Sequence, residues 1–342
     1  SIIYKLLPHT LTLFVLQTLA VTLSIVGIFK VGVTILKNPS LELLFSIIYS
    51  WYWGISGLLL FDFHVEVLIL PFISWGLFFM LTNKLKMSVI LFFLAMLCKE
   101  DVGIFIGMLG LYNLVKRNFR YGLLLFTMGF LWSGLIVFKI MPLIRTEGLD
   151  TMARYSYLGT KPSEMIKTFF IRPDIVIAEV LFLHKFSYLL KLFLPVGGLI
   201  ILAPLACLLF LPTLLLNILA DYPAQSSATY QYDMLNTIGI FFATFSGIAW
   251  FNLKYPEALK RKSFIYFSLI LVILINIIFV VNHPLIDRIY NFEFRKSDFQ
   301  SVQKARSIIP KSAIISTSNN LGSHFIENEK LLLFDPKWID YD

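Results

Sequence analysis

The sequence predicts an all-α protein that crosses the membrane many times, with about nine or ten membrane segments, some of them short or broken. Hydrophobic residues make up 58% of the 342 residues, whereas charged residues make up only 15%. A soluble domain carries about a quarter charged residues, so this composition cannot cover a water-facing surface. The apolar residues also gather in long runs, and basic residues gather in the loops between alternate runs.

The apolar runs define the expected membrane segments, since a helix needs about 20 mostly apolar residues to cross a bilayer. They are Thr10–Leu36, Leu41–Phe61, Val65–Leu81, Leu85–Cys98, Val102–Val115, Tyr121–Ile144, Phe186–Ala220, Leu235–Leu253 and Phe264–Val281. Pro195, Pro204 and Pro212 interrupt Phe186–Ala220, and proline breaks the helical hydrogen-bond ladder. We therefore expect two short, kinked segments there, within a helical membrane domain that covers residues 1–285.

Basic residues concentrate in four connecting loops, which hold ten Lys and Arg residues against one acidic residue, Glu257. These loops lie at Lys37, at Lys84 and Lys86, at Lys116–Arg120 and at Lys254–Lys262. Cytoplasmic loops are enriched in Lys and Arg, so we expect all four on the cytoplasmic side. This arrangement requires Leu85–Cys98 and Val102–Val115 to form a hairpin. If they formed one continuous helix, the membrane orientation of every later segment would be reversed.

Residues 286–342 differ from the rest and predict a small extracytoplasmic α/β segment. Ser297–Ile308 has a helical pattern, and Ala313–Thr317 and Lys330–Phe334 have strand patterns. Asn319–Gly322 favours a turn or helix start over a phosphate-binding loop, since no glycine-rich pattern accompanies it. The chain starts at Ser1 rather than at Met and stops at Asp342, so we expect both ends to be incomplete.

The first candidate site contains Asp62, His64 and Glu66, which alternate along the chain at the mouth of a membrane segment. A carboxylate there can act as a general base or a metal ligand, and histidine as an acid, a base or a ligand. The alternative is a solvated connection in which Asp62 caps the following helix. A histidine between two acids has little use in packing, which favours the functional interpretation.

The second candidate site is the run Lys99, Glu100 and Asp101, which interrupts an otherwise apolar stretch. A charge placed in a membrane helix costs about 2.5–3.5 kcal/mol on insertion scales, so such residues usually pair or face a polar cavity. The alternative is a hairpin tip exposed to water.

Two further polar segments flank later membrane segments. Arg154 lies in the long connection before Phe186, close to Tyr157, and arginine suits bidentate phosphate binding. The run Tyr230–Asp233 precedes a membrane segment, and Gln231 and Asp233 can hydrogen-bond a sugar or hold a neighbouring residue. The alternatives are an interfacial connector at Arg154 and a tyrosine anchor at Tyr232.

Several classes of function find no support. No basic stripe interleaved with aromatic residues indicates a nucleic-acid partner. Cys98 and Cys207 lie in apolar runs and define no disulfide framework. The sequence contains no phosphate-binding P-loop, zinc-ligand spacing or nucleophile elbow.

The order of these motifs resembles a known family. Asp62-Phe63-His64-x-Glu66, Lys99-Glu100-Asp101, Tyr157-Leu158-Gly159 and Gln231-Tyr232 follow one another as in the bacterial and archaeal membrane proteins called domain of unknown function 2079. Pro8, Gln17 and the tail residues Ile309, Pro310, Phe334, Asp335 and Pro336 also fit this family. The resemblance covers nearly the whole chain.

The resemblance implies a GT-C-like fold, because this family is similar to the GT-C glycosyltransferases. Those enzymes take a sugar from a polyprenyl-phosphate carrier on the extracytoplasmic face. The resemblance therefore implies a site on the outer face of a prokaryotic plasma membrane for this chain. The implied catalytic residues are Asp62, His64, Glu66, Glu100 and Asp101. The implied substrate- or phosphate-binding residues are Lys99, Arg154, Tyr157, Gln231 and Tyr232. A divalent cation, Mg or Mn, would bind Asp62, His64 and Glu66.

The sequence departs from the family at its start. Family members begin with a further membrane segment and an external loop that carries an aspartate, and this chain begins after that region. If that aspartate is the main catalytic acid, the acids found here act as second participants. The expected partners are membrane lipids and a lipid-linked sugar, with no nucleic acid. The alternatives are a lipid or ion transporter and a non-catalytic subunit with partners in a larger membrane assembly.

Overall fold

The computed structural model describes residues 10–60, 63–144, 150–257, 262–281, 286, 292–317, 319–322, 325 and 328–333. The chain divides into two compact units, and each is described here by itself. The larger unit, Leu13–His283, is a helical bundle. The smaller unit joins Pro284–Asp342 to Ser1–Thr12.

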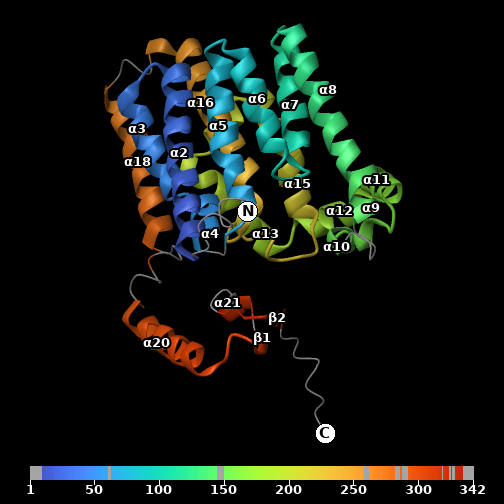
Figure 1. Ribbon diagram of the computed structural model, residues 1–342. Coiled ribbons are helices and arrows are strands. Elements are labelled where there is room, and N and C mark those ends of the chain that lie inside the picture. The colour runs from blue at the N-terminus through green and yellow to red at the C-terminus, as the bar shows by residue number, and fades with distance from the viewer. Residues whose placement is uncertain are drawn as a thin grey trace. The chain divides into compact units, whose positions relative to one another are not determined.

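The first half of the helical bundle consists of helices that run alternately up and down (Figure 1). They are α2 (Thr10–Leu36), α3 (Pro39–Ser50), α4 (Trp53–Leu60), η1 (Val65–Leu68), α5 (Ile69–Leu81), α6 (Leu85–Met96), α7 (Val102–Val115), α8 (Phe119–Leu135), the π-helical turn η2 (Ile136–Ile140) and α9 (Met141–Ile144). The predicted hairpin is confirmed, because α6 and α7 are separate helices joined by a turn at Cys98–Asp101. The single segment expected over Leu41–Phe61 is wrong, since the helix breaks at Trp51 and Tyr52 into α3 and α4.

The second half contains shorter and more irregular elements before two long helices. They are α10 (Asp150–Ala153), η3 (Ser156–Leu158), α11 (Pro162–Ile171), α12 (Pro173–Val180), α13 (Leu183–Phe193), η4 (Leu194–Val196), η5 (Leu199–Leu202), α14 (Pro204–Cys207), α15 (Leu211–Leu219), η6 (Gln231–Asp233), α16 (Met234–Lys254) and α18 (Lys262–Val281). The kinks expected in Phe186–Ala220 are present. Each of Pro195, Pro204 and Pro212 lies in the first turn of a new short helix, where its missing N–H costs nothing.

Glycines bring α7 and α8 into close contact. A Cβ atom on Gly110 would lie 2.2 Å from the backbone nitrogen of Phe126, and one on Gly129 would lie 2.3 Å from the carbonyl oxygen of Gly103. Membrane helices lack a hydrophobic drive to associate with one another, so small residues that allow close backbone packing stabilise them. This contact fixes α7, and with it the turn that carries Lys99.

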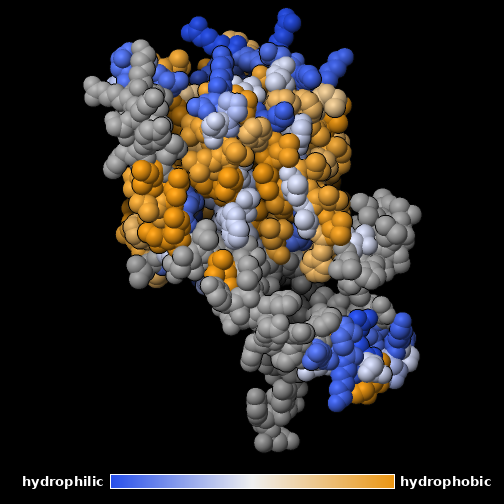
Figure 2. All heavy atoms as spheres, turned by 90° about the vertical axis from the view of Figure 1, so that its left-hand side faces the viewer, coloured by the Kyte–Doolittle hydropathy of each residue, from blue (hydrophilic) through white to orange (hydrophobic). Residues whose placement is uncertain are grey.

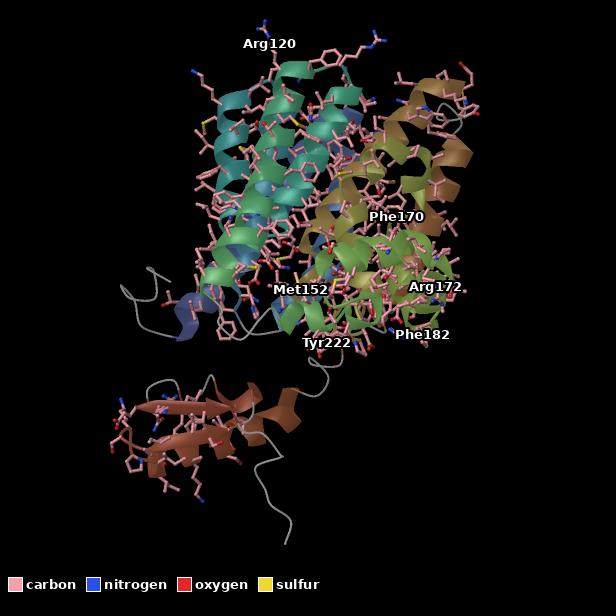
Figure 3. All side chains as sticks on the ribbon, turned by 90° about the vertical axis from the view of Figure 1, so that its right-hand side faces the viewer. Arg120, Met152, Phe170, Arg172, Phe182 and Tyr222 are labelled. Atoms are coloured by element: carbon pink, nitrogen blue, oxygen red, sulfur yellow. The ribbon has the colours of Figure 1, made fainter. Side chains whose placement is uncertain are left out.

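The two ends of the bundle differ in chemistry. The exposed basic side chains of Lys37, Lys84, Lys116 and Lys254 follow helices that end at one end of the bundle, and Figure 2 shows hydrophilic atoms there above a hydrophobic band. Figure 3 places Arg120 at this end, and Met152, Arg172, Phe182 and Tyr222 at the opposite end. Three described stretches of helix are long and apolar enough to cross a membrane: Thr12–Leu36, Phe119–Leu143 and Gln231–Lys254.

The smaller unit contains a helix and two parallel strands. Helix α20 (Phe292–Ile308) precedes β1 (Ile314–Thr317), which pairs in parallel with β2 (Lys330–Leu333), and Ile314 lies opposite Lys330. The short helix α21 (Asn319–Gly322) follows β1, so the structure confirms a helix start at these residues. The prediction of a predominantly helical fold with a small α/β segment agrees with these elements.

Candidate functional site

The turn between α6 and α7 presents Lys99 and Asp101 at the end of the bundle opposite the basic loops. Lys99 Nζ lies 3.0 Å from Asp101 Oδ2, and both side chains are about four-fifths buried. The turn is tied to α8, because the Ser133 hydroxyl donates a hydrogen bond of 2.7 Å to the Glu100 carbonyl oxygen. A buried charge needs a partner, and the ion pair supplies one.

The surroundings keep Lys99 charged. Burial alone would lower the pKa of its ammonium group, but the carboxylates of Asp101, Glu100 and Glu66 together outweigh that effect and raise the pKa above its usual value. Lys99 is therefore a permanent positive charge at neutral pH. The effect of Glu66 on the pKa of Lys99 shows that the two side chains lie within electrostatic reach of each other. The first predicted cluster therefore lies near the Lys99–Asp101 turn.

Arg154 supplies a second positive charge, beside an aromatic ring that Lys99 also approaches. Its guanidinium carbon lies 4.4 Å from the centre of the Tyr222 ring and 5.5 Å from that of Tyr232, while Lys99 Nζ lies 5.8 Å from the Tyr232 ring centre. Arg154 Nη1 also donates a hydrogen bond of 2.8 Å to Gln225 Oε1. Two cations from distant parts of the chain thus converge on Tyr232. The face of an aromatic ring carries partial negative charge and attracts cations.

Asp233 anchors the segment that carries Gln231 and Tyr232. Its side chain is 1% exposed, and Oδ1 accepts hydrogen bonds from Tyr188, Asn217 and Asn236 at 2.6, 3.1 and 2.9 Å. Buried carboxylates are tolerated where donors surround them, so this network holds the start of α16 in place.

A close approach of α4 supports the same segment from the other side. A Cβ atom on Gly57 would lie 2.4 Å from the carbonyl carbon of Thr229. Only glycine leaves room for the backbone there. The position of Gln231 and Tyr232 therefore depends on α4 as well as on the network around Asp233.

A small hollow opens between these elements, without enclosed space for even a water molecule. Its lining consists of Ile69, Lys99, Asp101, Gln231, Tyr232, Met234 and Leu235. Two acceptor atoms of this lining, Asp101 Oδ1 and Gln231 Oε1, are buried and have no hydrogen-bond donor among the described residues. Pockets for whole small molecules usually measure about 300–1,000 Å³, so this hollow marks where these polar side chains meet and is not a formed ligand pocket.

The first predicted cluster is described only in part. His64 Nδ1 lies 3.7 Å from Glu66 Oε2, whereas Asp62 lies outside the described residues. Within the described ranges, no group of three or more His, Cys, Asp or Glu side chains could hold a metal ion. The divalent-cation site at Asp62, His64 and Glu66 stays a prediction.

Tyr157, predicted to bind substrate, has a packing role here. Its hydroxyl donates a hydrogen bond of 2.7 Å to the carbonyl oxygen of Leu219, at the end of α15. The neighbouring Tyr155 hydroxyl likewise donates to the Leu216 carbonyl at 2.9 Å. These bonds fix the connection that carries Arg154 against α15, and substrate binding by Tyr157 stays a prediction.

Several residues of the site escaped the sequence reasoning. Tyr222 and Gln225 hold Arg154, and Tyr188, Asn217 and Asn236 hold Asp233. Tyrosine is common at membrane interfaces, so the presence of Tyr188 and Tyr222 in the sequence indicated nothing by itself. Only Asn217 and Asn236 carried a signal, since amides inside apolar runs need partners.

Comparison with known families agrees with this architecture. A family model described as a predicted membrane protein, DUF2079, matches residues 1–342. The chain belongs to this family. The family predicted from the four motifs is thus confirmed, and this DUF2079 chain is a membrane protein with helical membrane segments. No curated protein and no solved structure matches the chain.

Proposed function

We propose that this DUF2079 protein is a GT-C-like glycosyltransferase that moves a sugar from a polyprenyl-phosphate carrier to an acceptor outside the cytoplasm. The observation that carries the proposal is the convergence of Lys99 and Arg154 on Tyr232 at one end of the bundle. Two fixed cations that converge on one aromatic ring suit a phosphate group, and arginine in particular matches phosphate geometry.

The orientation follows from charge. The end that carries the basic loops faces the cytoplasm by the positive-inside rule, so the end that carries Arg154 faces outward. A lipid carrier in the outer leaflet would then reach Lys99 and Arg154 with its phosphate at the level of the helix ends. The exposed apolar side chains of Phe170 and Phe182, on the same half of the bundle, suit contact with lipid at that level (Figure 3).

The chemistry requires one base and one stabilised leaving group. The acceptor hydroxyl oxygen attacks the anomeric carbon, the bond from that carbon to the phosphate oxygen breaks, and the phosphate leaves with the bonding electrons. Lys99 and Arg154 stabilise the charge that develops on the phosphate. Asp62 or Glu66 takes the hydroxyl proton as general base. Asp101 orients Lys99 through their ion pair.

The test is transfer of labelled sugar from polyprenyl-phosphate sugars by the purified full-length protein. We expect Asp62→Asn or Glu66→Gln to reduce the rate by about 10²–10⁴-fold, as for loss of a general base. Glu164→Gln is the matched control, because Glu164 is an exposed acid that accepts hydrogen bonds from its sequence neighbours Thr160 and Lys161. Full activity in both acid variants would place the base elsewhere, and a wild-type protein that consumes no lipid-linked sugar would refute the proposal.

A further inference from the structure

Glu42 is a fully buried acid that does not belong to the proposed site. It lies in the first turn of α3, its exposed fraction is 0%, and both carboxyl oxygens lack a hydrogen-bond donor among the described residues. No Lys, Arg or His in the described ranges forms an ion pair with it. An ionised carboxylate in such a place would be strongly unfavourable.

The helix start does not provide the missing donors. Glu42 stands near the amino end of α3, where free backbone N–H groups often stabilise acids. Here the Asn38 side chain accepts a hydrogen bond from the Leu41 N–H at 3.2 Å, and the Glu42 N–H itself donates to the Asn38 carbonyl oxygen. The Glu42 side chain turns away from this end and against α2.

The contact with α2 leaves no room for a counter-ion on that side. A Cβ atom on Gly32 would lie 1.7 Å from Glu42 Oε2, so the carboxyl group packs directly on the glycine backbone. One helical turn further along α3, Ser46 is 5% exposed, and its hydroxyl also lacks a partner among the described residues. Residues four apart lie on the same helix face, so one buried face of α3 carries both groups.

We propose that Glu42 is a proton-binding site, held as an uncharged carboxylic acid in the contact between α2 and α3, and a site of covalent modification by hydrophobic carbodiimides. A carbodiimide adds the acid O–H across one of its C=N bonds, and the product rearranges to a stable N-acylurea. The reaction requires a protonated acid. This inference does not depend on sugar transfer, since it concerns residues outside the proposed site.

The experiment treats the purified full-length protein with dicyclohexylcarbodiimide and with a water-soluble, cationic carbodiimide, and maps the adducts by peptide mass spectrometry. We expect the hydrophobic reagent to label Glu42 at least about tenfold more than the water-soluble one. Glu164 is the internal control, because it is exposed and its hydrogen bonds lower the pKa of its carboxyl group, so the hydrophobic reagent should not label it.

The variant Glu42→Gln provides the second measurement. It removes the acid but keeps the shape, so the adduct should disappear while the melting temperature shifts by less than about 2 °C. Ser46→Ala should retain the adduct at Glu42. The proposal is overturned if Glu42 stays unlabelled in the folded wild-type protein. It is equally overturned if Glu42→Gln lowers the melting temperature by more than about 5 °C, which would reveal a charged partner for the carboxylate.

Discussion

The guanidinium group of Arg154 stacks beside Tyr232, with its central carbon 5.5 Å from the ring centre, although the two residues lie far apart in sequence. Tyr222 completes the arrangement, since its ring lies nearly perpendicular to that of Tyr232 at 6.5 Å. Arg154, which is half-buried, is thereby held against two rings. A cation fixed in this way loses little side-chain entropy when it binds an anion.

Replacing Arg154 by lysine tests whether geometry matters as well as charge. Arg154→Lys keeps the positive charge but loses the planar stacking and the hydrogen bond to Gln225. A hydrogen bond to a charged group contributes about 1.5–3 kcal/mol, so we expect the affinity for polyprenyl phosphate to fall about 10–100-fold. Arg172→Lys is the control, because Arg172 is exposed and pairs only with Asp174 among the described acids. Equal affinity in both variants would show that Arg154 contributes charge alone.

Asp233 is expected to be a stability residue. Asp233→Ala would leave Tyr188, Asn217 and Asn236 without the acceptor that they share. Each buried polar group left unsatisfied costs about 1–3 kcal/mol, so the free energy of unfolding should fall by about 3 kcal/mol or more. Thermal unfolding in detergent measures this change. Asp174→Ala, at an exposed position, should change it by less than about 0.5 kcal/mol, and a similar result at Asp233 would contradict the network.

The sequence was sufficient to predict the helices but not the details of the site. Lys99, Glu100 and Asp101 indicated a turn inside an apolar stretch, because three adjacent charges cannot lie in lipid, and the structure has a turn there. The break at Trp51 escaped prediction, since Leu41–Phe61 is mostly apolar and contains no proline. Hydropathy shows that a run is buried, but it does not show where tertiary packing interrupts its hydrogen bonds.

The candidate site shows the same limit. Charge and spacing singled out Lys99, Arg154 and Tyr232, and the structure brings these three together. Asp233, which directly follows Tyr232 in sequence, is the centre of a buried network. Its partners come from α13, α15 and α16, and no local pattern in the sequence indicates that three helices meet at one carboxylate.

The glycine contact between α7 and α8 predicts whether a glycine-to-alanine substitution raises or lowers stability. Alanine is favoured over glycine in a helix by about 1 kcal/mol, so a glycine on a free surface should gain stability when it is replaced. Gly134 has no atom within 4 Å of its ideal Cβ position, and Gly134→Ala should be neutral or stabilising. Gly129→Ala would force its Cβ against the backbone of Gly103 and Gly107, so we expect a loss of about 1–3 kcal/mol. A gain in thermal stability at Gly129 would contradict this packing.

The orientation in the membrane can be measured by cysteine labelling. With Cys98 and Cys207 replaced by serine, cysteines at Asn118 and Lys254 should react with a membrane-impermeant reagent only after the cytoplasmic side is opened. Cysteines at Asp174 and Asp221 should react in intact cells, because these exposed positions are close in sequence to Arg172 and Tyr222, which Figure 3 places toward the other end of the bundle. Labelling of position 118 from outside would reverse the topology and place the proposed site in the cytoplasm.

Binding of a lipid phosphate tests the central claim most directly. The measurement is native mass spectrometry of the purified full-length protein with polyprenyl phosphate and, as the matched uncharged ligand, polyprenol. We predict that the wild-type protein retains polyprenyl phosphate in preference to polyprenol. The double variant Lys99→Gln, Arg154→Gln should lose this preference, with an affinity reduced by about 100-fold or more, as for the loss of two charged hydrogen bonds. Equal retention of the two lipids by the wild-type protein, or unchanged binding of polyprenyl phosphate by the double variant, would contradict the account.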